Sequence, residues 1–197
     1  GEVKKIHADS DDAWLDVRSE LEWMGNDKRL LWLSEKNGWR RINLVTRSGE
    51  KVTGITPAGF DVIDIKGVDN QNDYIYFMAS PDDPKRRYLY RIKGDGSEMA
   101  RVTPGNVSGM NSYNISPDCS LAVHTFSTFD TPPVIALIKL PSHEVVKVLR
   151  DNANLTNQFK LLARRPVEFF RINIGGDVLL DGWSLTPPDF DKSKKYP

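Results

Sequence analysis

Apolar residues recur along the chain in runs of strand length, separated by short polar turns. These runs are rich in Val, Ile, Leu, Tyr, Phe and Trp, as half-buried strands require. The expected strands cover residues 21–24, 29–34, 39–46, 51–56, 61–68, 74–79, 88–93, 99–103, 110–116, 121–127, 134–140 and 144–149. Corresponding strands return after roughly 40–48 residues, the period of a four-stranded propeller blade.

The turns between the runs support the same grouping. Asn37-Gly38 is suited to a tight hairpin because both residues tolerate positive φ. Pro57 and Gly59 close the first group of four strands. A sandwich or an ordinary barrel would also have short strands, but neither needs a fixed period of four. The pattern therefore predicts an all-β, partial β-propeller of about three four-stranded antiparallel blades, followed by a short helix and a β-hairpin.

The expected organisation has three parts. Residues 1–151 form the partial propeller, with blades near 20–56, 61–103 and 109–150, and residues 2–8 supply a leading strand from the blade before. Residues 152–165 form a helical linker, since Leu155, Phe159 and Leu162 have helical spacing. Residues 166–197 begin with a hairpin around Gly175-Gly176-Asp177.

The expected core lies between stacked blades. Replacing Trp32 with alanine is expected to lower the free energy of unfolding by roughly 3–5 kcal/mol. The residues expected to be largely buried are Trp23, Trp32, Ile42, Leu44, Val62, Ile75, Leu89, Ile92, Ile115, Val123 and Leu137.

Charge and composition exclude several classes of protein. The chain has 27 Lys and Arg residues against 27 Asp and Glu residues, so no net field favours nucleic acid or an anionic membrane. No apolar run approaches the roughly 20 residues that cross a bilayer. The single cysteine, Cys119, excludes a scaffold held together by internal disulfides.

Residues for catalysis are not expected in this sequence. A serine hydrolase of the α/β class needs a G-x-S-x-G turn, which is absent, and Ser108 lies in a turn before a strand. His124 is expected in the core and His143 in an exposed polar turn. The acidic cluster Asp9-Ser10-Asp11-Asp12 lacks the glycine and distal glutamate of a calcium loop. The sequence predicts no metal and no cofactor.

Several segments, in collinear order, resemble the propeller of the dipeptidyl peptidase IV group in the prolyl oligopeptidase family of serine peptidases. The ending PPDFDKSKKYP resembles the run that leads into the catalytic α/β-hydrolase domain of that group. The segments that carry the resemblance are residues 29–45, 60–68, 73–77, 87–92, 148–152 and 187–197.

The resemblance implies a non-catalytic propeller section of an enzyme that removes Xaa-Pro or Xaa-Ala dipeptides from peptide N-termini. Its implied partners are the peptide substrate, an α/β-hydrolase domain in the same polypeptide, of which residues 166–197 would be the first strands, and a second copy in a homodimer. It also implies a periplasmic, cell-envelope or secreted location. The pair of adjacent glutamates with which the group holds the substrate N-terminus does not occur here.

One segment is expected to face the substrate. Residues 13–23 (AWLDVRSELEW) resemble the segment that enters the cavity of the group near the pocket for the substrate's penultimate side chain. The resemblance singles out Trp14, Asp16 and Arg18. The alternative interpretation makes Trp14 part of a blade core and Arg18 an exposed charge at a strand end, because buried aromatic residues mostly serve packing.

Two further hypotheses remain open at this point. The chain could be a stand-alone propeller-like module that binds protein or glycan through the loops at 80–87 and 126–133. It could also be a purely structural interaction domain, which would explain the strands but not the C-terminal sequence.

Overall fold

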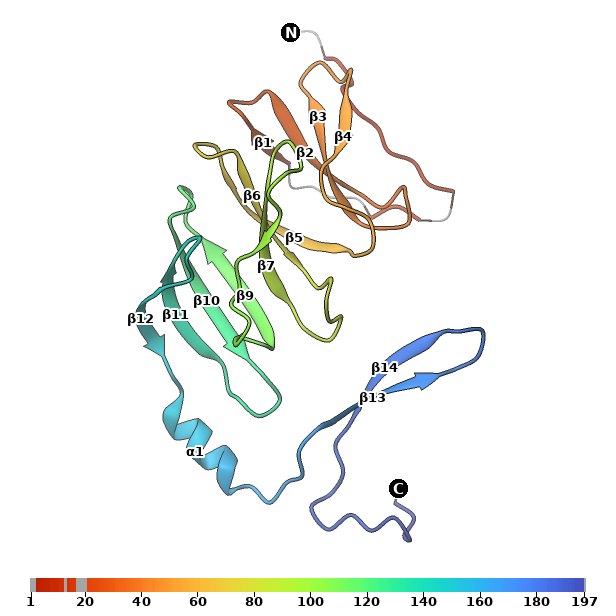
Figure 1. Cartoon of the computed structure of the whole chain (residues 1–197), viewed down its shortest axis with the longest axis vertical. Helices are drawn as coiled ribbons and strands as arrows, with labels where there is room; N and C mark the ends of the chain where they lie inside the picture. Colours follow the sequence, from red (N-terminus) through yellow and green to blue (C-terminus); the bar gives the residue numbers. More distant parts are fainter. Residues whose placement is uncertain (1–2, 13, 17–20, 197) are drawn as a thin grey trace.

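The computed structural model describes residues 3–12, 14–16 and 21–196, and its regular structure is nearly all β (Figure 1). The first sheet contains β1 (Glu22–Met24), β2 (Arg29–Ser34), β3 (Arg41–Thr46) and β4 (Val52–Gly54). The second contains β5 (Val62–Asp69), β6 (Tyr74–Ala79), β7 (Tyr88–Lys93) and β8 (Ala100–Arg101). The third contains β9 (Met110–Ile115), β10 (Leu121–Ser127), β11 (Val134–Lys139) and β12 (Val145–Arg150). Helix α1 (Ala153–Leu161) and the hairpin β13 (Glu168–Asn173) and β14 (Leu179–Ser184) follow.

Each large sheet is an antiparallel meander whose strands pair in chain order. The three sheets succeed one another along the molecule, and the helix and hairpin extend from the last of them (Figure 1). Within the described residues no sheet closes into a barrel. The predicted partial propeller of three four-stranded blades, with a short helix and a hairpin after it, is therefore confirmed.

Strand β6 shows how the blades are held together. All six of its residues are buried. Ile75, Phe77 and Ala79 pack in a cluster shared with the first sheet. Tyr74, Tyr76 and Met78 pack in a second cluster shared with the third sheet. Because successive side chains of a strand point to opposite faces, one strand supplies two cores, and the middle sheet is covered on both sides.

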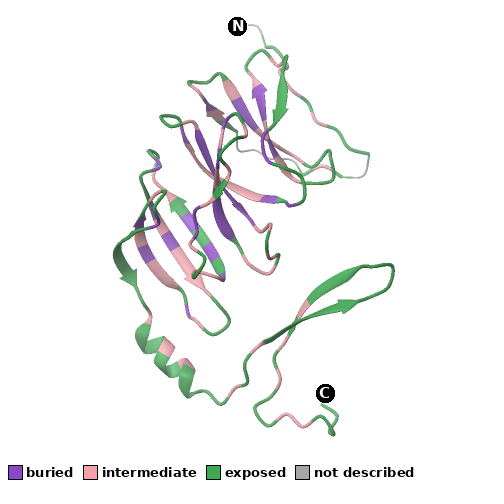
Figure 2. Ribbon diagram, in the orientation of Figure 1, coloured by how far each residue is buried: buried purple, intermediate pink, exposed green. Residues whose placement is uncertain are grey.

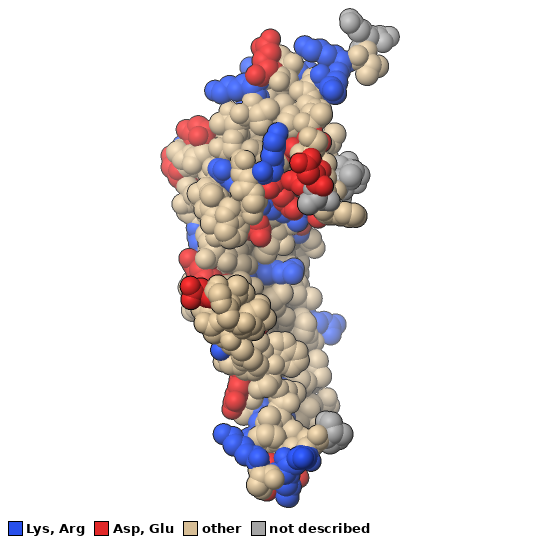
Figure 3. All heavy atoms as spheres, turned by 90° about the vertical axis from the view of Figure 1, so that its right-hand side faces the viewer, with Lys and Arg blue, Asp and Glu red and all other residues tan. Residues whose placement is uncertain are grey.

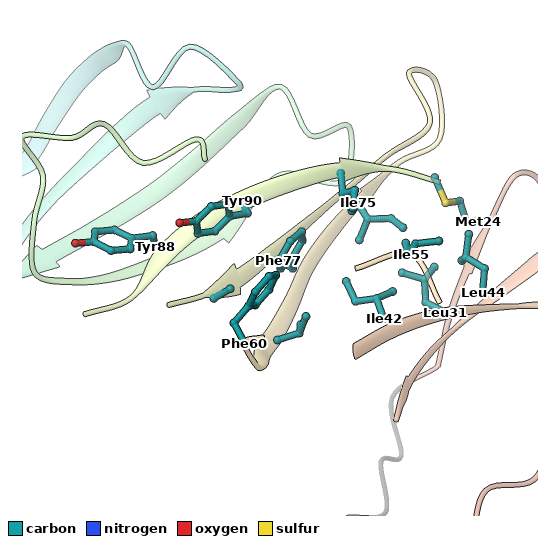
Figure 4. Packing of buried hydrophobic residues seen from close by; sticks show 13 residues of the cluster. Met24, Leu31, Ile42, Leu44, Ile55, Phe60, Ile75, Phe77, Tyr88 and Tyr90 are labelled. Atoms are coloured by element: carbon teal, nitrogen blue, oxygen red, sulfur yellow. The ribbon is translucent and has the colours of Figure 1, made fainter. Parts of the chain in front are cut away.

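The core between the first and second sheets is made of interlocking side chains from both (Figure 4). Ile42 and Leu44 of β3 and Met24 of β1 meet Ile75 and Phe77 of β6. The rings of Phe77 and Tyr90 stack with centroids 5.9 Å apart. These two rings lie side by side on the face of the second sheet that packs against the first sheet.

The third sheet is covered mainly on the face that points to the second sheet. In β10 and β11, Ala122, Ala136 and Ile138 are buried against the second sheet. Their neighbours Val123 and Leu137, which pair with each other across the two strands, point to the other face and are half-buried. The edge strand β12 is exposed along its whole length (Figure 2).

Six of the eleven residues expected to be largely buried are buried, whereas the other five are partly buried. They are Trp23, Trp32, Ile115, Val123 and Leu137. The first two and the last two lie on the faces of the terminal sheets that point away from the second sheet, and Ile115 packs at the margin of the second cluster. The hydrophobic pattern gives the alternation of a strand but not which of its two faces is covered.

Trp32 has a different role from the one expected. Its side chain lies on the face of β2 that points away from Leu31 and Leu33. The N-terminal segment covers this face. The rings of His7 and Trp32 lie 5.0 Å apart, and the indole N–H of Trp32 donates to Asp9 at 3.2 Å. Because the ring is only half-buried, Trp32→Ala should cost about 1–3 kcal/mol in unfolding free energy, less than a core aromatic residue. Urea denaturation followed by circular dichroism checks this; a loss above that range would contradict the observed burial.

The internal repeat extends to hydrogen bonds. The hydroxyl of buried Thr56 accepts the backbone N–H of Ile42 at 3.0 Å. In the second sheet the hydroxyl of buried Thr103 accepts the backbone N–H of Leu89 at 2.8 Å. Both threonines stand directly before a proline, at equivalent positions after the fourth strand. The recurring Thr-Pro thus ends each of the first two blades by hydrogen bonding to its third strand.

The helix and the hairpin differ from the blades in burial. Helix α1 has no buried residue, and every residue of β13 is exposed. No helix in the described part of the chain combines the length and apolar character needed to cross a membrane. The division of the chain at residues 151 and 166 into separate domains stays a prediction.

Candidate functional site

A small hollow lies where the N-terminal segment meets the first two sheets. Its volume is about 190 Å³. Leu15 and Leu21 line it from the N-terminal side, and Leu31 and Leu33 of β2 and Ile65 of β5 line it from the sheets. These side chains give the hollow an apolar wall of the size that accepts one side chain rather than a large ligand.

Carboxylates surround this apolar wall. Asp9, Asp16, Glu22 and Asp64 all line the hollow. Asp64 is paired with Lys66 at 2.7 Å. Burial alone would raise the pKa of Asp9, but hydrogen bonds from Ser34 and Trp32 outweigh it and hold that pKa below its ordinary value. The mouth is therefore acidic, and acidic side chains gather on the upper part of the face in Figure 3.

Of the three predicted site residues, the structure brings two together. Trp14 is 77% exposed, and its indole N–H donates to the carboxylate of Asp16 at 2.9 Å. Asp16 lines the acidic hollow. The alternative that made Trp14 part of a blade core is wrong, because the ring lies in solvent. Arg18 lies outside the described residues.

A second region joins the blades to the hairpin. Phe129, in the loop between β10 and β11, packs against Phe169 of β13 and Trp183 of β14, with ring centroids 5.7 and 5.0 Å away. Lys85, in the loop between β6 and β7, pairs with Asp181 at 3.5 Å. Asp181 in turn accepts a hydrogen bond from Arg171 at 2.8 Å. The two loops that the sequence offered as binding loops therefore hold the chain's own hairpin.

Sequence reasoning did not predict this contact. The loops and the hairpin are distant in the chain, and no periodicity links them. The one available signal was that Phe129 interrupts an otherwise polar loop. A hollow of about 410 Å³ lies beside the contact and is lined by Arg86, Ser108, Met110, Phe129 and Phe169, among others.

The contact between Phe129 and the hairpin should limit how readily a protease cleaves the linker that precedes the hairpin. Phe129→Ala removes two aromatic contacts, each worth about 0.5–1.5 kcal/mol. Trypsin cleavage after Arg164 should then be about fivefold faster or more, since Arg164 is itself held by Asp130 of the same loop. Phe190→Ala, which removes a ring stacked on Tyr196, is the matched control and should leave the cleavage rate unchanged. Equal rates for wild type and Phe129→Ala would contradict the contact.

The remaining candidate residues have structural partners. The hydroxyl of Ser108 is bonded to Arg86 and to the Tyr88 hydroxyl. His124 is buried and bonded to Asn111, as predicted for a core histidine. His143 is buried too, so the prediction of an exposed residue is wrong: the turn after β11 folds its ring beneath Tyr113. The described residues contain no group of three or more His, Cys, Asp or Glu side chains able to hold a metal ion.

Four-stranded antiparallel blades stacked in chain order define the class of the protein as a β-propeller. The chain belongs to the family of the dipeptidyl peptidase IV N-terminal region, whose model matches residues 1–133.

Relatives agree with this family. A probable dipeptidyl peptidase 4 of Aspergillus flavus is 23% identical over 195 residues, which cover 96% of this chain and 25% of the relative. A probable dipeptidyl-aminopeptidase B of Aspergillus clavatus is 28% identical over 73% of this chain and 16% of the relative. The chain thus spans about a quarter or less of the length of these relatives.

Solved structures show the same arrangement. The crystal structure of Porphyromonas gingivalis dipeptidyl peptidase 4 matches 90% of this chain and 24% of its own, with a TM-score of 0.79 and 26% identity. A putative dipeptidyl aminopeptidase IV from Bacteroides ovatus matches with a TM-score of 0.73 and 18% identity over 90% of this chain and 27% of its own, which shows the fold alone.

Proposed function

We propose that this chain is the non-catalytic propeller section of a serine peptidase of the dipeptidyl peptidase IV type. The whole enzyme removes Xaa-Pro or Xaa-Ala dipeptides from peptide N-termini. The observation that carries the proposal is the family match over residues 1–133, which takes in the first two blades and the first two strands of the third. In this proposal residues 152–165 are a linker and residues 166–197 are the first strands of the α/β-hydrolase domain.

The propeller's task in this proposal is to gate the active site and to help bind the peptide. The acidic hollow supports a binding role, because carboxylates around an apolar wall suit the cationic N-terminal end of a peptide and an adjoining side chain. Trp14 and Asp16 stand at its mouth, and an exposed ring held by a hydrogen bond offers a fixed apolar surface. The hypothesis of a stand-alone binding module is less favoured, because its two loops already hold the hairpin.

The peptidase that contains this propeller should show the contribution of these residues in its kinetics. Trp14→Ala and Asp16→Asn should each raise KM for a Gly-Pro chromogenic substrate about threefold to tenfold with kcat little changed, since they remove binding and not chemistry. Trp39→Ala, which changes an exposed tryptophan that does not line the acidic hollow, is the control. If KM is unchanged in both Trp14→Ala and Asp16→Asn, these two residues do not face the substrate.

The 197-residue chain by itself should not cleave that substrate, because it has no G-x-S-x-G turn. Turnover that is lost in Ser108→Ala would overturn this expectation.

Association through the uncovered sheet faces is expected as well. The first blade presents exposed apolar side chains such as Leu21 and Val52, and the hairpin presents Phe170 and Ile172. Large exposed apolar patches favour association. Light scattering over a concentration series should therefore show an average mass that rises with concentration, and a constant monomer mass would count against the expected homodimer.

A further inference from the structure

Five polar side chains form a buried chain of contacts between the second and third sheets. Thr103 follows β8, Asn111 and Tyr113 belong to β9, His124 belongs to β10, and His143 lies in the turn after β11. The hydroxyl of Tyr113 is 2.8 Å from that of Thr103 and 2.9 Å from Nε2 of His143. Nε2 of His124 is 2.7 Å from Oδ1 of Asn111. The ring of His124 stacks on Tyr113 at 4.6 Å and lies 4.8 Å from that of His143.

The direction of the hydrogen bonds follows from the fixed donors. Thr103 already accepts the backbone N–H of Leu89, so the described acceptor for its own proton is the oxygen of Tyr113. Tyr113 then donates to Nε2 of His143, which must carry a lone pair and therefore be neutral. This chain joins the third strand of one blade to the outer turn of the next.

The second histidine is fixed by an amide. The Nδ2 group of Asn111 donates to the carbonyls of Arg87, Val107 and Gly109, which leaves Oδ1 as an acceptor. His124 therefore donates through Nε2–H. In this arrangement both imidazoles are neutral, and they lie edge to face.

We propose that the contact between the second and third blades is an acid-sensitive joint, which protonation of His143 and His124 loosens. A proton on His143 turns Nε2 into a donor, so Tyr113 must reverse its bond and the Thr103 hydroxyl proton loses its acceptor. A second proton on His124 places two positive charges in adjoining buried rings.

The surroundings offer little to stabilise such charges. The groups that act on the cluster are the two histidines themselves and Arg101, a cation that bonds the carbonyl of Thr103 at 2.8 Å. No carboxylate is among the described groups that act on either imidazole. Burial, and then the neighbouring His143, lower the pKa of His124 to about 4, and burial lowers the pKa of His143.

Loosening of the contact between the second and third blades would also affect how the hairpin is held. The third sheet carries Phe129 and Asp130, which hold Phe169, Trp183 and Arg164. Acid would therefore weaken the placement of the hairpin on the blades without any change at the hairpin itself.

The repeat supplies an internal control for the test. The amide of Leu89 bonds to Thr103 within the cluster, whereas the amide of Ile42 makes the same bond to Thr56 in the first sheet, away from it. Hydrogen exchange of both amides in the whole chain is measured at about pH 7.5 and about pH 5. The ratio of the protection factor of Leu89 to that of Ile42 should fall at least about tenfold on acidification. In His143→Gln, whose side chain can accept from Tyr113 without titrating, the ratio should fall clearly less than in the wild type, because only His124 is left to take up a proton.

A constant ratio in the wild type, or an equal fall in His143→Gln, would overturn the proposal. If the variant does not fold, the imidazole resonances of the wild type decide the question. Both rings should stay neutral down to about pH 6 in the folded chain. Titration of the His124 or His143 imidazole at or above its ordinary pKa would contradict the proposal.

Discussion

Replacing Phe77 with alanine should lower the free energy of unfolding by roughly 3–5 kcal/mol. The side chain is completely buried in the middle of β6 and stacks on Tyr90 between the first two sheets (Figure 4). Removing it leaves a cavity that β3 and β6 cannot collapse to fill, because both strands are fixed by pairing on either side. Urea denaturation at neutral pH measures the loss as a shift of the transition midpoint.

Phe170→Ala is the matched control for this prediction. The same change of side chain in the hairpin removes a ring that is 40% exposed, so the loss should stay below about 1 kcal/mol. Similar losses at the two positions would mean that the face of β6 that carries Ile75 and Phe77 is not the joint between blades.

Acidification from about pH 7.5 to about pH 5 should cost the chain about 2 kcal/mol of stability through His124 alone, and roughly 3 kcal/mol at lower pH. The pKa of His124 falls from 6.5 to about 4 in the folded chain because the ring is buried beside His143. A histidine whose pKa is lowered by folding takes up its proton more readily in the unfolded chain. Its contribution is therefore complete above pH 6.5 and is lost as the pH falls from 6.5 toward 4.

This window separates the histidine from the carboxylates. Asp118, whose pKa is lowered to about 2 by hydrogen bonds from Ser116 and Ser120, contributes at neutral pH as well, but its contribution is lost only at more acid pH, as the pH falls from about 4 toward 2. Urea unfolding across the series should show most of the loss between pH 6.5 and 5 removed in His124→Gln. His7→Gln, which changes the histidine beside Trp32, should retain it. A wild-type stability that is flat over this window would contradict the buried, neutral state of His124.

Most of the architecture could be predicted from the sequence because its signals are local. The continuous apolar run of β6 and the hairpin residues at Gly38 and Gly175 specify strands and turns without reference to any neighbour. The period of the strands specifies the number of blades. The expected helical linker, residues 152–165, is a few residues longer than helix α1 (Ala153–Leu161), because helix ends fray and the hydrophobic pattern continues beyond the hydrogen bonds.

The candidate sites were less predictable. Trp14 and Asp16 were singled out by resemblance, but their exposure and mutual hydrogen bond belong to the folded chain. The burial of His143 had no local signal, since a histidine in a polar turn resembles any surface residue. The contact of Phe129 with the hairpin joins segments that are far apart in the chain.

The sequence by itself determined that this protein is a row of four-stranded blades, because hydrophobic periodicity and turn chemistry act over a few residues. Only the tertiary structure decided which face of each outer blade is covered, because a strand with apolar residues on both faces fits either assignment until its neighbours are placed. It likewise decided that His124 and His143 share one buried cluster with Tyr113, since hydrogen bonds between blades depend on how the blades stack.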